Sequence, residues 1–277
     1  LMEELQKPDM HHEEVRVKVI DILTNVQNPK VVHAYLNLLK DDSESREIKG
    51  RVLRSLYHLG KLDHYWEKHS FGRSYMLQIL EDLFQKTHSD PYLQKWLIMN
   101  IFVHKDSYQV VPFFLEIMES GDRELRSICL RSCMMFEDPE IVHYLYPYLQ
   151  DEDPRIKGHA LIAMWRFADK KVLRDVIRQL IYQPEEESQI AAIYAIGETK
   201  DHESRSLLPA FLHSPRKTTQ LHALVALTKL GEKMYAEHLV HFILTEDSQI
   251  AQTAYRMLER LPVDIQERIQ ERIHAAV

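Results

Sequence analysis

The histidines of this chain are the residues whose number and spacing most suggest chemistry. The sequence has 16 of them, and imidazole changes its charge near neutral pH, moves protons and binds metals. Apolar segments recur along the chain, and when they are aligned by their ends, histidine occupies three of six residues at one position. This position and one a helical turn away predict an outward row on the concave side of the fold: His33, His143, Tyr146, Asp175, Arg178, Ser206, His238 and His241.

Two interpretations of this row stay open. A ladder of His, Tyr and Arg side chains could bind an acidic or aromatic ligand and respond to pH near 6 to 7. The same residues could instead form ordinary polar surface, which is common on repeat proteins.

Metal and enzyme chemistry find little support in the other motifs. Glu237 and His241 lie one turn apart, but their segment lacks the His-Glu-x-x-His order of zinc proteases. The sequence has neither Gly-x-Ser-x-Gly nor a Gly-rich phosphate-binding loop among its 7 glycines. It therefore predicts a non-enzymatic protein with no catalytic residue, no metal and no cofactor.

The two cysteines, Cys129 and Cys133, lie four apart on one helical face. Free cysteine packs as a small apolar residue, so both are expected in the core. The absence of a disulfide framework suits a reducing compartment and predicts a cytoplasmic location. No apolar run approaches the roughly 18 residues of a membrane helix. Because the chain starts at Leu1 rather than Met, we expect that it is a fragment of a longer protein.

Charge argues against general binding to phosphate backbones, because the net charge is −7. One dense basic stretch nevertheless keeps nucleic acid as the alternative partner. Its residues, at spacings of three and four, are expected to line one side of a helix, with Glu44 and Glu47 interleaved: Arg46, Lys49, Arg51 and Arg54. A looser basic set follows: Arg123, Arg126 and Arg131.

A fixed period places all of these residues. Apolar stretches end at intervals of 31, 32, 31 and 32 residues: at Met118, Leu149, Ile181, Leu212 and Leu244. Pairs of small residues recur at intervals of 31, 32, 31 and 28: Cys129/Ser132, Ala160/Ala163, Ala192/Ala195, Ala223/Ala226 and Ala251/Ala254. A fixed period in this range is typical of stacked repeats.

Each repeat is expected to be a hairpin of two helices. Apolar residues recur at helical spacing, and openers such as Asp90-Pro91 and Asp153-Pro154 combine an N-cap with proline in the first turn. The first helices are predicted near 14–26, 45–59, 91–102, 122–135, 154–167, 185–197, 216–229 and 247–260. The second helices are predicted near 29–40, 73–86, 108–119, 139–150, 170–182, 202–213, 232–244 and 263–275.

The resulting fold class is all-α, an α-solenoid of about eight antiparallel hairpins, because stacking buries faces that one hairpin leaves exposed. We expect a single domain over 1–277, irregular over 1–119 and regular over 120–277, with a C-terminal cap. The period is broken by an inserted loop at 61–72, whose aromatic residues either bind a partner or cover the edge of the stack: Tyr65, Trp66 and Phe71.

The segment "SQIAAIYAIGETKDHESRSLLPAFL" resembles a HEAT repeat of the short bacterial kind also found in phycobilisome lyase subunits. Its Ala192-to-Gly197 core carries the resemblance, which is good over about 120–275. The resemblance implies that first helices form the convex side and second helices the concave side. It also implies a scaffold for a protein or peptide, and it allows a lyase-type chaperone. Some HEAT-like proteins are metal hydroxylases with His-Glu pairs, but here such pairs stand far apart, at 12–13 and 202–203.

Overall fold

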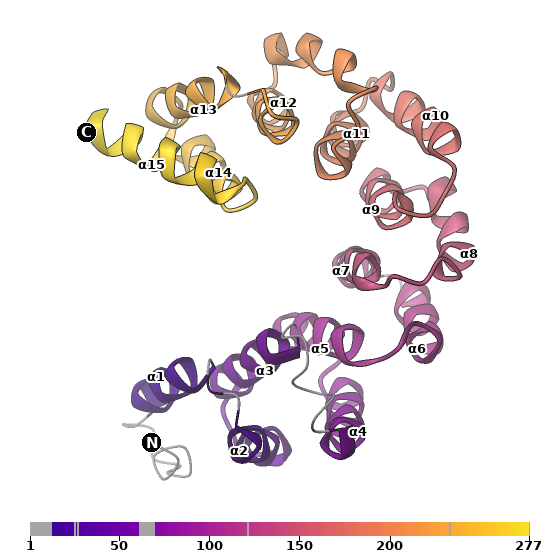
Figure 1. Cartoon of the computed structure of the whole chain (residues 1–277), viewed down its shortest axis with the longest axis vertical. Helices are drawn as coiled ribbons and strands as arrows, with labels where there is room; N and C mark the ends of the chain where they lie inside the picture. The colour runs from indigo at the N-terminus through magenta and orange to yellow at the C-terminus, as the bar shows by residue number, and fades with distance from the viewer. Residues whose placement is uncertain are drawn as a thin grey trace. The chain divides into compact units, whose positions relative to one another are not determined.

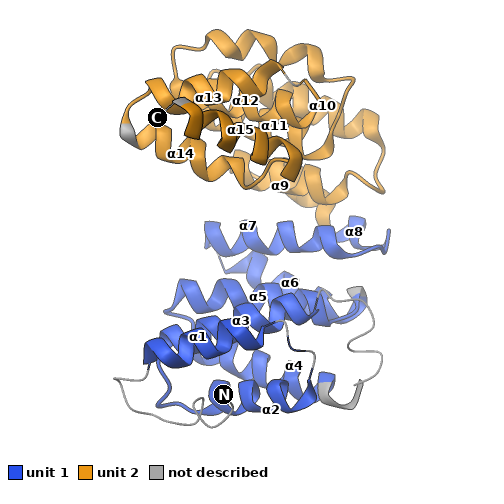
Figure 2. Cartoon of the chain, turned by 60° about the vertical axis from the view of Figure 1, so that its left-hand side comes forward, with its two compact units in different colours: residues 1–144 blue, residues 145–277 orange. Residues whose placement is uncertain are grey.

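A computed structural model describes residues 13–24, 26, 28–60, 70–120, 122–232 and 234–276. Throughout these residues the regular structure is helical, with no strand. The chain divides into two compact units, residues 1–144 and 145–277, which Figure 2 colours separately and which we describe one at a time. The predicted all-α helical-repeat fold is confirmed. That residues 1–277 form a single domain stays a prediction.

The first unit consists of consecutive helical hairpins. Its elements are α1 (Glu13–Leu23), α2 (Pro29–Lys40), α3 (Arg46–Gly60), α4 (Ser70–Lys86), α5 (Pro91–His104), α6 (Ser107–Glu119), α7 (Arg123–Ser132), the 3-10 turn η3 (Cys133–Met135) and α8 (Ile141–Leu145). The helices that open each hairpin pack against one another, α1 on α3, α3 on α5 and α5 on α7. We call these helices, together with their counterparts in the second unit, the first-helix layer (Figure 1).

The second unit repeats this plan. Its elements are η4 (Tyr146–Gln150), α9 (Pro154–Met164), α10 (Lys170–Ile181), α11 (Glu186–Thr199), η5 (Arg205–Leu207), η6 (Pro209–His213), α12 (Lys217–Lys229), α13 (Met234–Thr245), α14 (Ser248–Leu258) and α15 (Val263–Ala276). Here the first-helix layer consists of α9, α11, α12 and α14, and α9 packs on α11 and α11 on α12.

The predicted helix starts follow from capping. The Asp90 carboxylate accepts hydrogen bonds from the backbone N–H groups of Tyr92 and Leu93, and Asp153 accepts one from Arg155. In both helices proline occupies the first turn, where its missing N–H costs nothing. Apart from the predicted helices 139–150 and 202–213, helix bounds fall within a few residues of those predicted from the period.

Two predicted second helices are not regular α-helices. The segment 139–150 is a short α8 followed by the 3-10 helix η4, and 202–213 contains only η5 and η6. Pro147 and Pro209 stand at the starts of η4 and η6, where a missing N–H and the ring oppose continuation of an α-helix. In these two repeats, short segments with 3-10 geometry therefore take the place of a regular second α-helix.

Small residues let the first helices approach each other closely. Ala160, Ala192 and Ala223 are fully buried at the crossing points. A Cβ placed on Gly197 would lie only 2.9 Å from the Cα of Ala226, so α11 and α12 meet almost backbone to backbone. In the last repeat, the buried pair is Ala254 with Met257 rather than the predicted Ala251 with Ala254.

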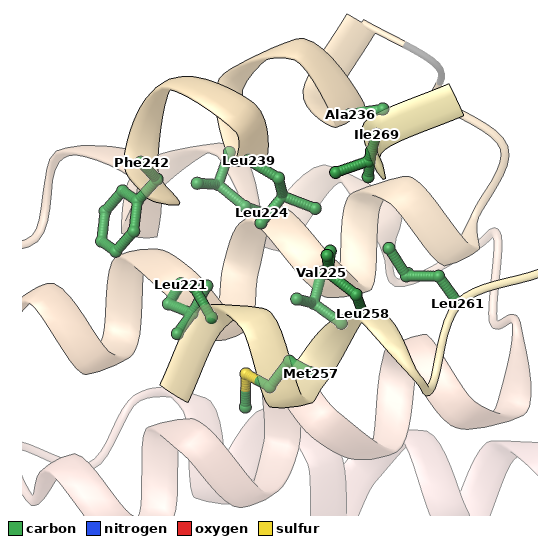
Figure 3. Packing of buried hydrophobic residues seen from close by; sticks show 11 residues of the cluster. Leu221, Leu224, Val225, Ala236, Leu239, Phe242, Met257, Leu258, Leu261 and Ile269 are labelled. Carbon is green, nitrogen blue, oxygen red and sulfur yellow. The ribbon is translucent and has the colours of Figure 1, made fainter. Parts of the chain in front are cut away.

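With Ala254 as the first residue of the buried pair, the last repeat keeps the period, because Ala254 follows Ala223 by 31 residues. Figure 3 shows the resulting core of the last two repeats, where Leu221 and Val225 of α12, Leu239 of α13 and Met257 of α14 pack together. Ile269 of α15 closes this cluster from the C-terminal side.

The curvature of the second unit is opposite to what the resemblance implied. Within 145–277, Figure 1 shows α9, α11, α12 and α14 along the inner side of the curve and α10 and α13 along the outer side. The physical reason is spacing, since a curved stack is tightest on its inner side. The small residues of the first helices allow that tight spacing. The first helices, not the second, therefore form the concave side of this unit.

Polar contacts tie neighbouring repeats together at the outer layer. Asp201 is 3% exposed, and its carboxylate accepts hydrogen bonds of 2.9–3.2 Å from Nε and Nη2 of Arg174 on α10. Ser204 donates a further hydrogen bond to the same carboxylate. A nearly buried carboxylate needs such partners to remain charged, so this cluster fixes the turn after α11 against α10.

Candidate functional site

The predicted row of polar residues is exposed and lies on the second segments of the hairpins. His33 is on α2, His143 on α8, Tyr146 on η4 and Ser206 on η5. Asp175 and Arg178 are on α10, and His238 and His241 are on α13: all eight side chains are exposed. Their predicted placement on the concave side is wrong for α10 and α13, which follow the outer side of the second unit (Figure 1).

The contacts of this row are local. Arg178 donates a hydrogen bond of 2.9 Å to Asp175 one turn earlier, and His143 lies 3.7 Å from Glu140 on its own segment. The His238 Nδ1 group lies 3.1 Å from the carbonyl oxygen of Met234. Among the described residues, the pair Asp175–Arg178 is the hydrogen-bonded contact that joins two members of the row. A role for the row in binding stays a prediction.

The predicted binding loop falls mainly outside the described residues. Tyr65 and Trp66 belong to 61–69, which the structure does not describe. Phe71 is in the first turn of α4, which begins at Ser70, so the helix includes the last residues of the predicted insertion. The contribution of Tyr65, Trp66 and Phe71 to binding stays a prediction.

The cysteines and one histidine are core residues. Cys129 and Cys133 are 0% and 1% exposed, and burial raises the pKa of both thiols. His104 is 1% exposed, and burial, aided by the positive charge of Arg73, lowers its pKa to about 3. None of these groups is accessible to a substrate in the folded unit.

An open hollow in the first unit gathers side chains of a different kind. It has a volume of about 480 Å³ and lies on the first-helix layer, between α3 and α5. Its lining residues are Arg46, Glu47, Arg51, Arg54, Tyr92 and Trp96. We call it the α3/α5 hollow. Arginines beside aromatic rings are typical of surfaces that bind other molecules.

The wall formed by Tyr92 is fixed in place by its neighbours. The Tyr92 ring occupies the space beside Gly50, where a Cβ would lie 2.2 Å from its Cε1 atom. The guanidinium of Arg46 lies 5.0 Å from the ring centroid, and its Nε atom donates a hydrogen bond of 2.6 Å to Asp90. This bond raises the pKa of Arg46 above its ordinary value. The ring and the arginine are therefore ordered before any ligand arrives.

Trp96 is anchored from beneath. Its ring meets Tyr57 edge-on, with centroids 6.0 Å apart. The Asn100 amide donates one hydrogen bond of 2.7 Å to the Trp96 carbonyl and another of 2.8 Å to the carbonyl of Leu53. Because Leu53 belongs to α3 and Trp96 to α5, the two walls of the α3/α5 hollow are joined through a buried amide.

The basic stretch predicted on α3 supplies only part of this site. Arg46, Arg51 and Arg54 line the hollow, but Lys49 is 7% exposed and belongs to the buried side of α3. The reason is helical phase, since residues two apart, such as Lys49 and Arg51, point in nearly opposite directions. The expectation that Lys49 shares the face of the arginines is therefore wrong.

Sequence reasoning missed the aromatic wall. Tyr92 and Trp96 are four apart on α5, a hairpin later than the arginines, and nothing local links them to α3. A usable signal existed, because a spacing of four places both half-buried rings on one face of the helix that stacks on α3.

A second, smaller hollow lies on the inner side of the second unit. Residues of α11, α12 and the segment around α14 line it, including Tyr194, His222, Lys229 and Arg260. Burial, followed by the charge of Arg260, lowers the pKa of His222 to about 4. Lys229 donates a hydrogen bond of 2.6 Å to Glu198, so its charge is compensated.

Within the described ranges, His, Cys, Asp and Glu form no group of three placed to hold a metal ion. None of the described helices combines the length and the apolar character needed to cross a membrane.

Known proteins are similar to the chain mainly in fold. Residues 173–259 match the family of HEAT repeats. A solved structure of the complex of CpcE and CpcF of phycocyanin lyase, from Nostoc sp. PCC7120, superimposes with a TM-score of 0.50 at 14% identity, covering 94% of this chain and 93% of the other. The structure of YibA from E. coli gives 0.46 at 16% identity, covering 94% and 91%. No curated protein matches the chain in sequence.

The match over 173–259 and the fold of the lyase complex agree with the period of the sequence and with the stacked hairpins of the structure. At such identities a shared structure establishes the fold alone, whereas the match over 173–259 is a match in sequence. The resemblance predicted from the sequence is confirmed, since residues 173–259 match the family of HEAT repeats.

Proposed function

We propose that the chain is a non-catalytic binding module that holds a protein or peptide on its first-helix layer, with the α3/α5 hollow as the principal contact. HEAT repeats are typical of proteins that bind other proteins, and a stack of hairpins offers an extended surface to an extended partner. The single observation that carries the proposal is the α3/α5 hollow itself, where Tyr92 and Trp96 are ordered beside three arginines.

The chemistry of the remaining residues supports a binding role over an enzymatic one. A nucleophile needs access and an activating base, and the thiols of Cys129 and Cys133 are buried with raised pKa values. The phycocyanin lyase complex shares the fold at 14% identity, which supports a common architecture. Among the described residues, none favours a lyase-type chaperone role over binding in general. A cytoplasmic location remains part of the proposal.

Nucleic acid is less well supported than protein. Two of the three arginines in the α3/α5 hollow already face carboxylates, Arg46 at Asp90 and Arg51 at Glu47. Lys49, which the nucleic-acid hypothesis needs on the surface, is buried. A phosphate backbone requires a row of uncompensated cations, and the hollow offers too few of them.

Site-specific photocrosslinking tests this proposal. A photoreactive phenylalanine derivative is placed at Lys95, beside Trp96 at the rim of the hollow, and in a matched protein at Asp175 on the outer helix α10. Both positions are exposed, so neither substitution disturbs the core. In extracts of the source cells we expect position 95 to crosslink to one segment of one polypeptide, and we expect position 175 to give no such product.

The crosslinked segment is then made as a peptide and its binding to the unmodified chain is measured. A crosslink formed at position 175 and absent at position 95 contradicts the proposal, and so does a crosslinked segment that fails to bind as a purified peptide.

A further inference from the structure

The α3/α5 hollow has an unequal distribution of compensated and uncompensated charge. Arg46 bonds to Asp90, and Arg51 bonds to Glu47 at 2.9 Å and lies 3.6 Å from Asp21. Arg54 lines the same hollow and is exposed, yet within the described part of the chain it has no ion-pair partner. Its guanidinium is therefore the group of the hollow that is most ready to receive an anion.

A second cation adjoins Trp96. Lys95 is exposed and its ammonium nitrogen lies 5.8 Å from the centroid of the Trp96 ring. Among the described residues no carboxylate pairs with it. Trp96 is thus a half-buried ring with Arg54 in the same hollow and Lys95 beside it, two cations that no carboxylate of the described residues pairs with.

We infer that the α3/α5 hollow binds an acidic peptide segment, in which a carboxylate pairs with Arg54 and a neighbouring aromatic side chain stacks on Trp96. This inference rests on the proposed function and names the ligand of that same site. A guanidinium fork matches a carboxylate in two parallel hydrogen bonds. The accessible part of the half-buried Trp96 indole provides a flat surface that a second ring can cover.

The volume of the α3/α5 hollow and the fixed positions of its walls agree with such a ligand. A volume of about 480 Å³ is within the range of sites that hold small ligands, and it accommodates a pair of side chains. The hollow is formed in advance, because Tyr92 is held by Gly50 and Arg46, and Asn100 joins the two walls. A site that is ordered beforehand loses little entropy on binding a short segment.

Substitution of Glu47 is expected to strengthen binding of the ligand, whereas substitution of Arg54 is expected to weaken it. The Glu47 carboxylate lines the hollow, bonds to Arg51 and is exposed. A ligand carboxylate would be repelled by Glu47 and would compete with it for Arg51. Replacing Glu47 with Gln therefore tightens binding of an acidic ligand, whereas replacing Arg54 with Gln weakens it, and general damage to the fold could not produce both results.

Isothermal titration calorimetry with short capped peptides tests the inference. The probes are Glu-Asp-Phe-Asp-Glu, its amide counterpart Gln-Asn-Phe-Asn-Gln, its alanine counterpart Glu-Asp-Ala-Asp-Glu and an oligothymidylate. The proteins are the unmodified chain, Arg54→Gln, Glu47→Gln and the control Arg268→Gln, whose arginine is exposed on α15 of the second unit.

We expect the acidic phenylalanine peptide to bind most tightly, roughly tenfold weaker binding in Arg54→Gln, roughly twofold tighter binding in Glu47→Gln and no change in Arg268→Gln. Equal binding of the amide peptide overturns the inference, as do an unchanged affinity in Arg54→Gln, tighter binding of oligothymidylate and an absence of binding. Failure here is distinguishable from failure of the proposed function, because a crosslink from position 95 to a segment without carboxylates would retain the function and exclude only this ligand.

Discussion

The guanidinium of Arg46 on α3 lies 5.0 Å from the ring centroid of Tyr92 on α5. These residues belong to successive hairpins, and the contact brings a cation and an aromatic ring together at the surface of the first-helix layer. Stacking of similar helices thus creates a site that neither helix contains alone. The repeat sets the positions of the helices, and side chains that differ between repeats, such as Arg46 and Tyr92, form the site.

The close approach of α11 and α12 predicts that Gly197→Ala destabilises the second unit. A Cβ at Gly197 would lie 2.9 Å from the Cα and 3.0 Å from the Cβ of Ala226, so backbone must move. We expect a loss of about 1–3 kcal/mol in the free energy of unfolding, reduced by the better helix propensity of alanine. Urea denaturation measures it.

Gly158→Ala is the matched control, because its Cβ would meet Ala191 at 3.3 Å, a contact that a small shift relieves. Equal stability changes for the two substitutions would contradict the proposed backbone contact at Gly197.

The Arg174–Asp201 ion pair predicts a large effect of Asp201→Ala. The carboxylate is 3% exposed and accepts three hydrogen-bond contacts of 2.9–3.2 Å from Arg174. Its removal takes this partner from Nε and Nη2 of Arg174 and from the Ser204 hydroxyl, whereas Nη1 of Arg174 keeps its ion pair with Glu203 at 2.6 Å. We expect destabilisation of about 2–4 kcal/mol. Thermal and urea unfolding provide the measurement.

On the same helix, Arg178→Ala removes an ion pair with Asp175 in which both side chains are more than half exposed. Such pairs contribute about 0.5 kcal/mol or less. A loss in this control as large as that of Asp201→Ala would show that burial is not the cause.

The period and the caps of this chain made the fold predictable, because each signal is local and repeated. Asp153 followed by Pro154 sets a helix start by capping alone. The prediction of which helices form the concave side was wrong for the second unit. That side is set by the layer whose helices are more closely spaced, and here it is the layer in which Gly197 meets Ala226. The same distances explain the correction.

The candidate site was predictable only in part, because its two walls come from different hairpins. Arg51 and Arg54 were recognised from their spacing on one helix. Their relation to Tyr92 and Trp96 depends on how α5 is rotated against α3, which the period does not specify. The prediction that Lys49 lies on the surface was wrong, because Lys49 and Arg51 are two residues apart and point to nearly opposite sides of α3.

Burial of His104 predicts acid sensitivity of the first unit. Its pKa is lowered from 6.5 to about 3, so between these values the unfolded chain binds a proton that the folded chain does not. Stability is complete above pH 6.5 and falls as the pH decreases, by about 2 kcal/mol at pH 5. We expect His104→Gln to remove this part of the pH dependence.

Urea unfolding from pH 7 down to pH 5 provides the comparison, and His143→Gln, at an exposed position, is the control. The explanation fails if His104→Gln retains the wild-type pH profile or if His143→Gln changes it.

Burial of both cysteines predicts slow thiol chemistry in the folded protein. Cys129 and Cys133 are 0% and 1% exposed, and burial raises the pKa of both thiols. We expect an aromatic disulfide reagent to modify them roughly 100-fold or more slowly than in concentrated guanidinium, because reaction requires local opening. Rapid modification of the folded chain would show that the core around α7 is open.

The central claim is that ligand binds at Trp96 on the first-helix layer, and the indole N–H resonance of Trp96 tests it most directly. The chain has 3 tryptophans, at positions 66, 96 and 165. A Trp96→Phe spectrum identifies the resonance, and Trp165 of the second unit serves as an internal control. Titration with the acidic phenylalanine peptide is predicted to shift the Trp96 resonance and to leave that of Trp165 in place. A stationary Trp96 resonance at saturating peptide, with a shift at Trp165 instead, would contradict the account.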